Sequence, residues 1–147
     1  MKNLSLLFLS LTILFLSCGR STPVSESEDA SVSGDKTCVE ILYFHGDMRC
    51  KNCYAMEKGV SELLTQEFFQ EVKEGKIIFK TIDITTGEGE RIADNYGVTW
   101  SSLFLNNWDN GNEERNDLTK IGMKNAAKNP KTFKAEVKGY ILKYLNN

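Results

Sequence analysis

The chain has 147 residues, with 18 basic and 20 acidic side chains and a formal net charge of −2. Because the balance is slightly acidic, the composition gives no electrostatic reason to bind nucleic acid, and it offers no basic tract for anionic lipid. The length is that of one ordinary domain preceded by a short N-terminal segment.

Residues 1–17 have the pattern of a bacterial signal peptide. Lys2 gives a positive start, and residues 4–16 are almost wholly apolar. That run is too short to span a bilayer comfortably and has the length of a signal-peptide core. Ser17 followed by Cys18 resembles a lipobox, in which the cysteine is lipidated and becomes the new N-terminus. We therefore expect a lipid on Cys18, with an ordinary cleaved signal peptide as the alternative.

Residues 18–36 are rich in serine and acidic side chains and have few large apolar ones. Such a segment cannot bury enough surface to offset the entropy of ordering it. It is predicted to be a flexible tether that links the lipid to a folded domain at residues 37–147. The protein is therefore predicted to lie in the bacterial cell envelope, outside the cytoplasm, and to be anchored to a membrane by its lipid.

The folded part is predicted to begin with a strand and a helix. Residues 39–44 form a near-continuous apolar run, which suits a central strand covered on both faces. From about residue 50 to residue 73 the apolar side chains recur at helical spacing, which predicts one long helix. We place Phe68 and Phe69 of this helix in the core, and Gly75 ends it.

Five further elements follow, at residues 77–84 (strand), 90–96 (helix), 103–105 (strand), 112–118 (strand) and 130–145 (helix). Asn110-Gly111 favours a hairpin, because these residues tolerate positive φ at both turn positions. The polar strand that follows is typical of a sheet edge. The order β-α-β-α-β-β-α predicts an α/β fold, a three-layer α/β/α sandwich with a mixed central sheet.

Cys50-Lys51-Asn52-Cys53 lies where the first strand gives way to the first helix. A helix N-terminus favours an anion, and thiolate is the reactive form of cysteine. The spacing brings the second sulfur within bonding distance of the first. Arg49 and Lys51 should favour the thiolate further. We assign Cys50 as attacking nucleophile and Cys53 as resolving thiol of a redox-active Cys50–Cys53 disulfide.

Residues 39–144 resemble a thioredoxin-fold domain that lacks the extra N-terminal strand and helix. The shared features are the strand before CxxC, the long helix after it, the strand ending Thr81-Ile82-Asp83, the helix ending Tyr96-Gly97-Val98, and the hairpin with a terminal helix. More narrowly, residues 43–46, 49–53 and 101–103 are similar to thioredoxin-like proteins of the nitrophenyl compound nitroreductase subunit ArsF family. This resemblance implies an electron-handling partner.

Thioredoxins place a cis-proline opposite CxxC, just before the third strand. Here Trp100, Ser101 and Ser102 occupy that stretch, and the two prolines, Pro23 and Pro130, lie elsewhere. Because other residues disfavour a cis bond, we expect a differently arranged loop that still faces the sulfurs and contacts the substrate or partner. Trp100 either covers the sulfurs as an apolar platform or simply packs against its neighbours.

His45 and Cys38 are the other candidate reactive side chains. His45 is the only histidine, five residues before Cys50, and its usual pKa range suits proton transfer near neutral pH. The alternative is a histidine at a strand end, bonded to backbone or water. Cys38 has no obvious mate and is interpreted as a lone thiol.

Taken together, these patterns predict an extracytoplasmic thiol–disulfide oxidoreductase or electron-relay protein. Its expected partners are a protein disulfide or redox protein and, through the lipid, a membrane surface. We expect a monomer with no cofactor and no nucleic-acid partner. We also expect no resident metal, since a closed zinc site would need more ligands than one histidine and one cysteine pair provide. Two alternatives stay open: a non-catalytic partner-binding module with a structural disulfide, and a dithiol that captures a soft metal or arsenite.

Overall fold

A four-stranded mixed sheet in the order β2-β1-β3-β4 forms the centre of the molecule. The structure, a computed structural model, describes residues 36–146. The predicted signal peptide, the predicted lipidation site Cys18 and the predicted tether up to residue 35 lie outside the described residues.

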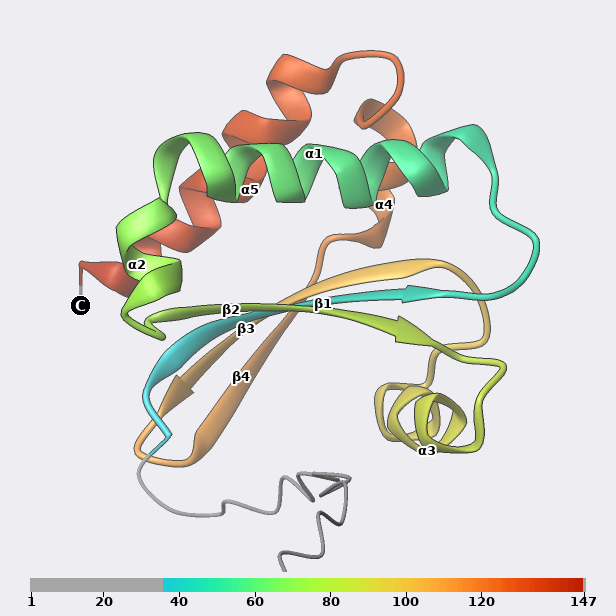
Figure 1. Cartoon of the computed structure of the whole chain (residues 1–147), viewed down its shortest axis with the longest axis horizontal. Coiled ribbons are helices and arrows are strands. Elements are labelled where there is room, and N and C mark those ends of the chain that lie inside the picture. The colour runs from blue at the N-terminus through green and yellow to red at the C-terminus, as the bar shows by residue number, and fades with distance from the viewer. Residues whose placement is uncertain (1–35, 147) are drawn as a thin grey trace, which may run out of the picture. The chain divides into compact units, whose positions relative to one another are not determined.

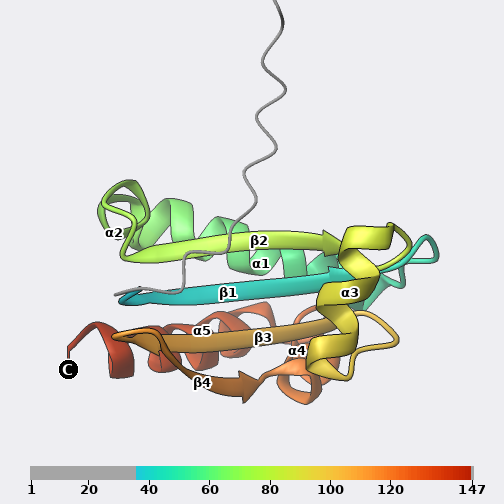
Figure 2. The same cartoon turned by 90° about the horizontal axis from the view of Figure 1, so that it is seen from below.

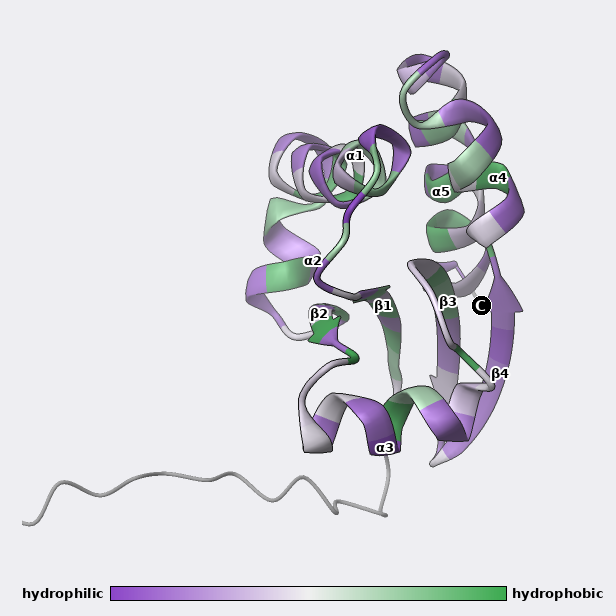
Figure 3. Cartoon of the chain, turned by 90° about the vertical axis from the view of Figure 1, so that its right-hand side faces the viewer, coloured by the Kyte–Doolittle hydropathy of each residue, from purple (hydrophilic) through white to green (hydrophobic). Residues whose placement is uncertain are grey.

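The strands are β1 (Cys38–His45), β2 (Ile77–Asp83), β3 (Ser102–Asp109) and β4 (Asn112–Asp117). β1 pairs in parallel with β2 and antiparallel with β3, and β3 pairs antiparallel with β4. The most apolar strand, β1, thus occupies a central position, where both of its faces are covered. Figure 3 shows β1 as hydrophobic and β4 as hydrophilic, and β4 occupies a sheet edge as predicted.

In the described part of the chain, a group of helices covers one face of the sheet and another helix covers the opposite face (Figure 1). The first group comprises α1 (Lys51–Glu67), α2 (Phe69–Lys73), α4 (Thr119–Asn125) and α5 (Pro130–Leu145). The opposite helix is α3 (Gly87–Tyr96), whose N-cap Thr86 accepts a hydrogen bond from the Gly89 N–H. None of the helices in the described part is both long and apolar enough to cross a membrane.

Side chains of β1 alternate between two hydrophobic cores. Ile41 and Tyr43 point into the larger core with α1 and α5, whereas Leu42 and Phe44 point into the smaller core under α3. This alternation explains why the strand reads as a continuous apolar run. It also holds the C-terminal end of β1, and therefore the start of α1, in a fixed position.

The predicted single helix over residues 50–73 is wrong, because the chain breaks at Phe68, where φ is −130°. The predicted core position is confirmed for Phe68, which is buried, and wrong for Phe69, which is 58% exposed. Adjacent helical residues point about 100° apart, and only one of this pair can face the core.

Helix α4 was not predicted from the sequence. It is only seven residues long and contains Gly122, a poor helix former. The structure explains this glycine, because a Cβ at this position would lie 2.2 Å from the sulfur of the buried Met56 on α1. The close approach of α4 to α1 therefore requires Gly122, the same residue that makes a helix hard to predict here from the sequence.

The predicted hairpin between β3 and β4 is confirmed. Asn110 and Gly111 have φ of 48° and 78°, the left-handed values that the turn requires at both positions. Asn and Gly adopt this conformation at lower cost than other residues. The turn sets the register that pairs Asp109 with Asn112.

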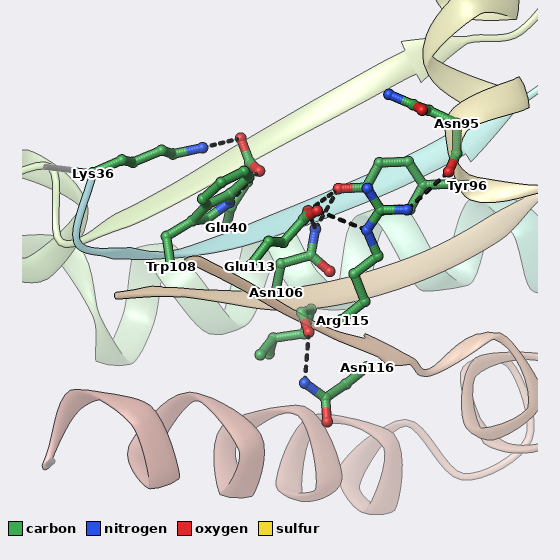
Figure 4. A network of polar contacts seen from close by, with 10 residues as sticks. Lys36, Glu40, Asn95, Tyr96, Asn106, Trp108, Glu113, Arg115 and Asn116 are labelled. Carbon is green, nitrogen blue, oxygen red and sulfur yellow. Dashed lines mark hydrogen bonds and ion pairs between the residues drawn. The ribbon is translucent and has the colours of Figure 1, made fainter. Parts of the chain in front are cut away.

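Helix α3 lies across only one end of its sheet face (Figure 2). Beyond it, a network of polar side chains covers the strands (Figure 4). Buried Glu40 bonds Trp108 Nε1 at 2.9 Å and pairs with Lys36 at 3.0 Å and Lys80 at 3.1 Å. A second group joins Tyr96, Asn106, Glu113 and Arg115. Polar side chains therefore pair with one another on a part of the face that no helix shields, although the buried Oδ1 of Asn106 accepts no hydrogen bond.

The strand order, the helical crossover between parallel strands, the antiparallel hairpin and the terminal helix define a thioredoxin-like α/β fold. The predicted three-layer sandwich with a mixed sheet is confirmed, with α2 and α4 as additions to the predicted order.

Candidate functional site

Cys50 and Cys53 form a disulfide at the start of α1, with their Cα atoms 5.0 Å apart. Cys50 is the N-cap residue, in extended backbone conformation, and its Sγ accepts a hydrogen bond from the Cys53 N–H at 3.1 Å. Its carbonyl oxygen accepts from the Tyr54 N–H, which closes the first helical turn. The first sulfur therefore lies where backbone N–H groups favour a thiolate.

The two cysteine residues differ sharply in their exposure to solvent. Cys50 is exposed, whereas Cys53, in the first turn of α1, is only 3% exposed. An external disulfide or thiol can therefore approach Cys50 far more readily than Cys53. This asymmetry fits a nucleophile at Cys50 and a resolving thiol at Cys53.

Arg49 does not stand free beside Cys50. Its guanidinium pairs with Glu57 of α1, donates to the Tyr43 hydroxyl at 3.3 Å, and lies 4.4 Å from the centre of the Tyr54 ring. Burial lowers the pKa of Arg49, but the hydrogen bonds to Glu57 and Tyr43 outweigh it and raise the pKa overall. The positive charge expected to act on Cys50 thus already has a carboxylate partner.

Sequence reasoning missed Tyr43, Tyr54 and Glu57 as neighbours of the cysteine pair. The usable signal was the helical spacing, because Glu57 lies four residues after Cys53 and projects from the same side of α1. The contact of Tyr43 with Arg49 had no comparable signal, since it depends on how the chain turns between β1 and α1.

His45 lies at the end of β1 near the turn that follows β2. Its Nδ1 is 3.3 Å from the Gly46 carbonyl oxygen, and its ring stacks on Tyr43 with centroids 6.0 Å apart. Opposite it, the Asp83 carboxylate accepts from the Thr85 N–H and hydroxyl; these bonds, with a smaller contribution from His45, lower the pKa of Asp83. These contacts match a histidine at a strand end, and its role in proton transfer stays a prediction.

The predicted partner loop lies beside the β1–α1 junction. Ser102 pairs with Phe44 across the sheet, which brings the preceding residues to the same end as Cys50. Trp100 is 67% exposed, whereas Ser101 and Ser102 are buried, and the Ser102 hydroxyl donates to the Trp100 carbonyl at 3.2 Å. Because most of its surface is exposed, Trp100 does not pack into the core. Among residues 36–146 no peptide bond is cis.

A groove of about 400 Å³ extends from this loop toward α4. Trp100 and Ser102 line it at one side, and Thr119, Lys120 and Met123 of α4 contribute to the other. The exposed Met48 and Tyr54 lie on the cysteine-bearing segment nearby in the chain. Apolar side chains thus remain accessible around the disulfide.

The other cysteine in the described part, Cys38, is a buried free thiol. Burial raises its pKa, so it is less ready to ionise than an ordinary cysteine. Within residues 36–146 no cluster of three or more His, Cys, Asp or Glu side chains could hold a metal ion.

Neither a protein-family model nor a curated protein matches this chain. Similar solved structures include a thioredoxin from Thermus thermophilus, at 18% identity and a TM-score of 0.42, over 68% of this chain and 74% of that one. Thioredoxin-2, a component of malaria parasite protein secretion machinery, has 20% identity and a TM-score of 0.40, over 61% and 85%. A thioredoxin-like protein from Clostridium perfringens has 13% identity and a TM-score of 0.38, over 76% and 93%. The topology described above, rather than these likenesses, defines the fold.

Proposed function

We propose that this protein is a thiol–disulfide oxidoreductase or electron-relay protein that works outside the cytoplasm. The observation that carries the proposal is the pairing of an exposed Cys50, at a helix N-cap, with a buried Cys53 in one disulfide. A structural disulfide requires neither the exposed sulfur nor its place at the positive end of a helix.

In the reducing direction, the Cys50 thiolate attacks one sulfur of a partner's disulfide and forms a mixed disulfide. The partner's other sulfur leaves as a thiolate and takes a proton from solvent. Cys53 then loses its proton to solvent and attacks Cys50 Sγ, which releases the partner's remaining sulfur. The partner gains two electrons, and the Cys50–Cys53 pair loses two. A second thiol protein must return those electrons, and the reverse sequence oxidises a partner dithiol.

Variants of the two cysteines test this assignment. Cys53→Ser should accumulate mixed disulfides with partner proteins, because nothing resolves them, whereas Cys50→Ser should trap none. Cys38→Ser is the matched control, since it removes a buried thiol without touching the pair, and it should leave trapping by Cys53→Ser unchanged. Equal trapping by both active-site variants, or no reduction of insulin or of a small disulfide by the native protein, would refute the proposal.

The anchor is a separate part of the proposal. The lipobox-like Ser17-Cys18 after an apolar segment supports a lipid on Cys18. Metabolic labelling with a radioactive fatty acid should mark the native protein, and Cys18→Ser should abolish the label and release the protein from membranes. Labelling that persists in Cys18→Ser would refute lipidation at this residue without affecting the redox assignment.

The similarity of residues 43–46 and 49–53 to the nitrophenyl compound nitroreductase subunit ArsF family supports an electron-handling protein as the partner. Mass spectrometry of the complexes trapped by Cys53→Ser would identify that partner. Recovery of oxidoreductases that carry a redox cofactor is the expected result, and recovery of only unfolded disulfide proteins would contradict it.

A partner-binding module is the second candidate, and the exposure of Trp100, Met48 and Tyr54 near the disulfide favours it. In that case partner binding would survive replacement of both active-site cysteines by serine. Under the redox proposal, the double variant should lose all disulfide turnover even where some binding remains.

A further inference from the structure

Arg49 and Glu57 form an ion pair at the edge of the disulfide site. The Arg49 side chain is only 15% exposed and that of Glu57 is 31% exposed, so solvent screens this pair less than one on the open surface. Two aromatic rings hold the guanidinium, with centroids 4.4 Å (Tyr54) and 5.3 Å (Tyr43) from its central carbon. These contacts therefore restrict the motion of the guanidinium and keep it close to the Glu57 carboxylate.

The chain brings one charge to each cysteine. Arg49 directly precedes Cys50, and Glu57 follows Cys53 by four residues on α1. Residues at that helical spacing lie on one side, about 5–6 Å apart at their Cβ atoms. A guanidinium directly before Cys50 and a carboxylate one helical turn after Cys53 thus flank in the chain a pair of sulfurs that must carry negative charge in the reduced protein.

We propose that Arg49 and Glu57 are opposed positioning residues that together set the reduction potential of the Cys50–Cys53 pair. The inference rests on the proposed redox function. A positive neighbour stabilises the thiolate of the reduced state and a negative neighbour destabilises it. Stabilising the reduced state raises the reduction potential. Glu57 neutralises most of the effect of Arg49, so the removal of either charge should move the potential, in opposite directions.

Other charged or titratable groups lie on the same segment of the chain and on α4 and α5, which pack against α1, and they stay constant in the comparison. They are Tyr43 and His45 of β1, Asp47 of the loop, Lys51, Tyr54 and Lys58 of α1, Lys120 and Lys124 of α4, and Lys134 and Lys138 of α5. The two lysines of α5 pair with Glu62 and Glu67, farther along α1. Within the described part, Arg49 is the partner that the structure gives to the Glu57 carboxylate.

The test uses the full-length protein with Glu57→Gln, Arg49→Gln and Arg49→Lys. The potential is measured in glutathione buffers, and the pKa of the Cys50 thiol is measured from alkylation rates against pH. Glu57→Gln should lower the thiol pKa and raise the potential. Arg49→Gln should do the reverse, each by about threefold to tenfold in the equilibrium constant with glutathione. Tenfold corresponds to about 30 mV for this two-electron couple. Arg49→Lys keeps the charge and should stay closer to the native potential than Arg49→Gln.

Glu67→Gln provides the matched control, since it removes an ion-paired carboxylate from the same helix, about 15 Å farther along it than Glu57. Its potential should remain that of the native protein. A merely structural role for the Arg49–Glu57 pair predicts shifts in one direction for both variants, or none, and either result overturns the inference. Should Arg49→Gln fail to fold, an unchanged potential in Glu57→Gln would still overturn it. A native protein that does not cycle between dithiol and disulfide would instead refute the proposed function itself.

Discussion

Gly59 lies within α1 where this helix meets Phe133 of α5. A methyl group at this position would lie 2.8 Å and 2.9 Å from two carbons of the Phe133 ring. Ordinary carbon contacts are about 3.5–4.0 Å, so one element must move by about 0.7 Å. Phe133 is fully buried and cannot turn into solvent. Overpacking of this kind typically costs about 1–3 kcal/mol.

The matched variant is Gly139→Ala on α5, where an added methyl group meets nothing within 4 Å. Both variants gain the helix preference of alanine, about 0.5–1 kcal/mol, so the difference between them isolates the clash. For a folded part of about 110 residues, each kcal/mol shifts the melting temperature by about 4 °C. Thermal unfolding followed by circular dichroism should place Gly59→Ala about 4–12 °C below Gly139→Ala. Equal melting temperatures would refute the claim that Phe133 fixes the spacing of α1 and α5.

Three further substitutions probe the polar network, the partner loop and the hairpin. Burial opposes ionisation of Glu40, but hydrogen bonds from Lys36 and Trp108 lower its pKa overall. Its ionised form therefore stabilises the fold above the unfolded-state pKa, and this contribution is lost as the pH falls. The stability gap between native protein and Glu40→Gln in urea unfolding should shrink from pH 6 to about pH 3, and a constant gap would contradict this. Trp100→Ala should lower kcat/KM for insulin reduction about tenfold, as for an aromatic anchor, with little change for a small disulfide; equal losses for both substrates would argue against a partner contact. Gly111→Ala forces a side chain into a positive φ of 78° and should cost about 1–2 kcal/mol in urea unfolding without moving the redox potential. An unaltered midpoint would show that the turn tolerates a Cβ.

Sequence patterns that extend over only a few residues predicted much of the fold. The apolar run of β1, the helical spacing after Cys50 and the Asn110-Gly111 turn each depend on residues close in the chain. The strand and the turn were predicted in the right place, and the helix was predicted correctly at its start but not at its break at Phe68. Together these signals gave the mixed sheet and the three layers. The position of Cys50 at a helix start was equally local, since it follows from where a strand pattern becomes a helix pattern.

The errors arose where packing between distant segments decided the outcome. Phe68 and Phe69 are equally apolar, but only one direction from α1 leads into the core. Helix α4 carries a glycine that only its contact with Met56 explains. The burial of Glu40 could not be predicted from the sequence either, because its partners Lys80 and Trp108 lie on other strands.

The sequence by itself determined the order of the strands and of the three main helices, together with the two cysteines at the start of the first helix, because backbone preference and side-chain periodicity act over a few residues. Only the tertiary structure decided which sulfur faces solvent, that Trp100 is exposed, and that Arg49 is paired with Glu57 and Tyr43. Those features depend on the direction in which the chain leaves β1 and on the surfaces that α1 then meets. Exposure and charge pairing are properties of neighbours in space, and the chain order alone does not specify them.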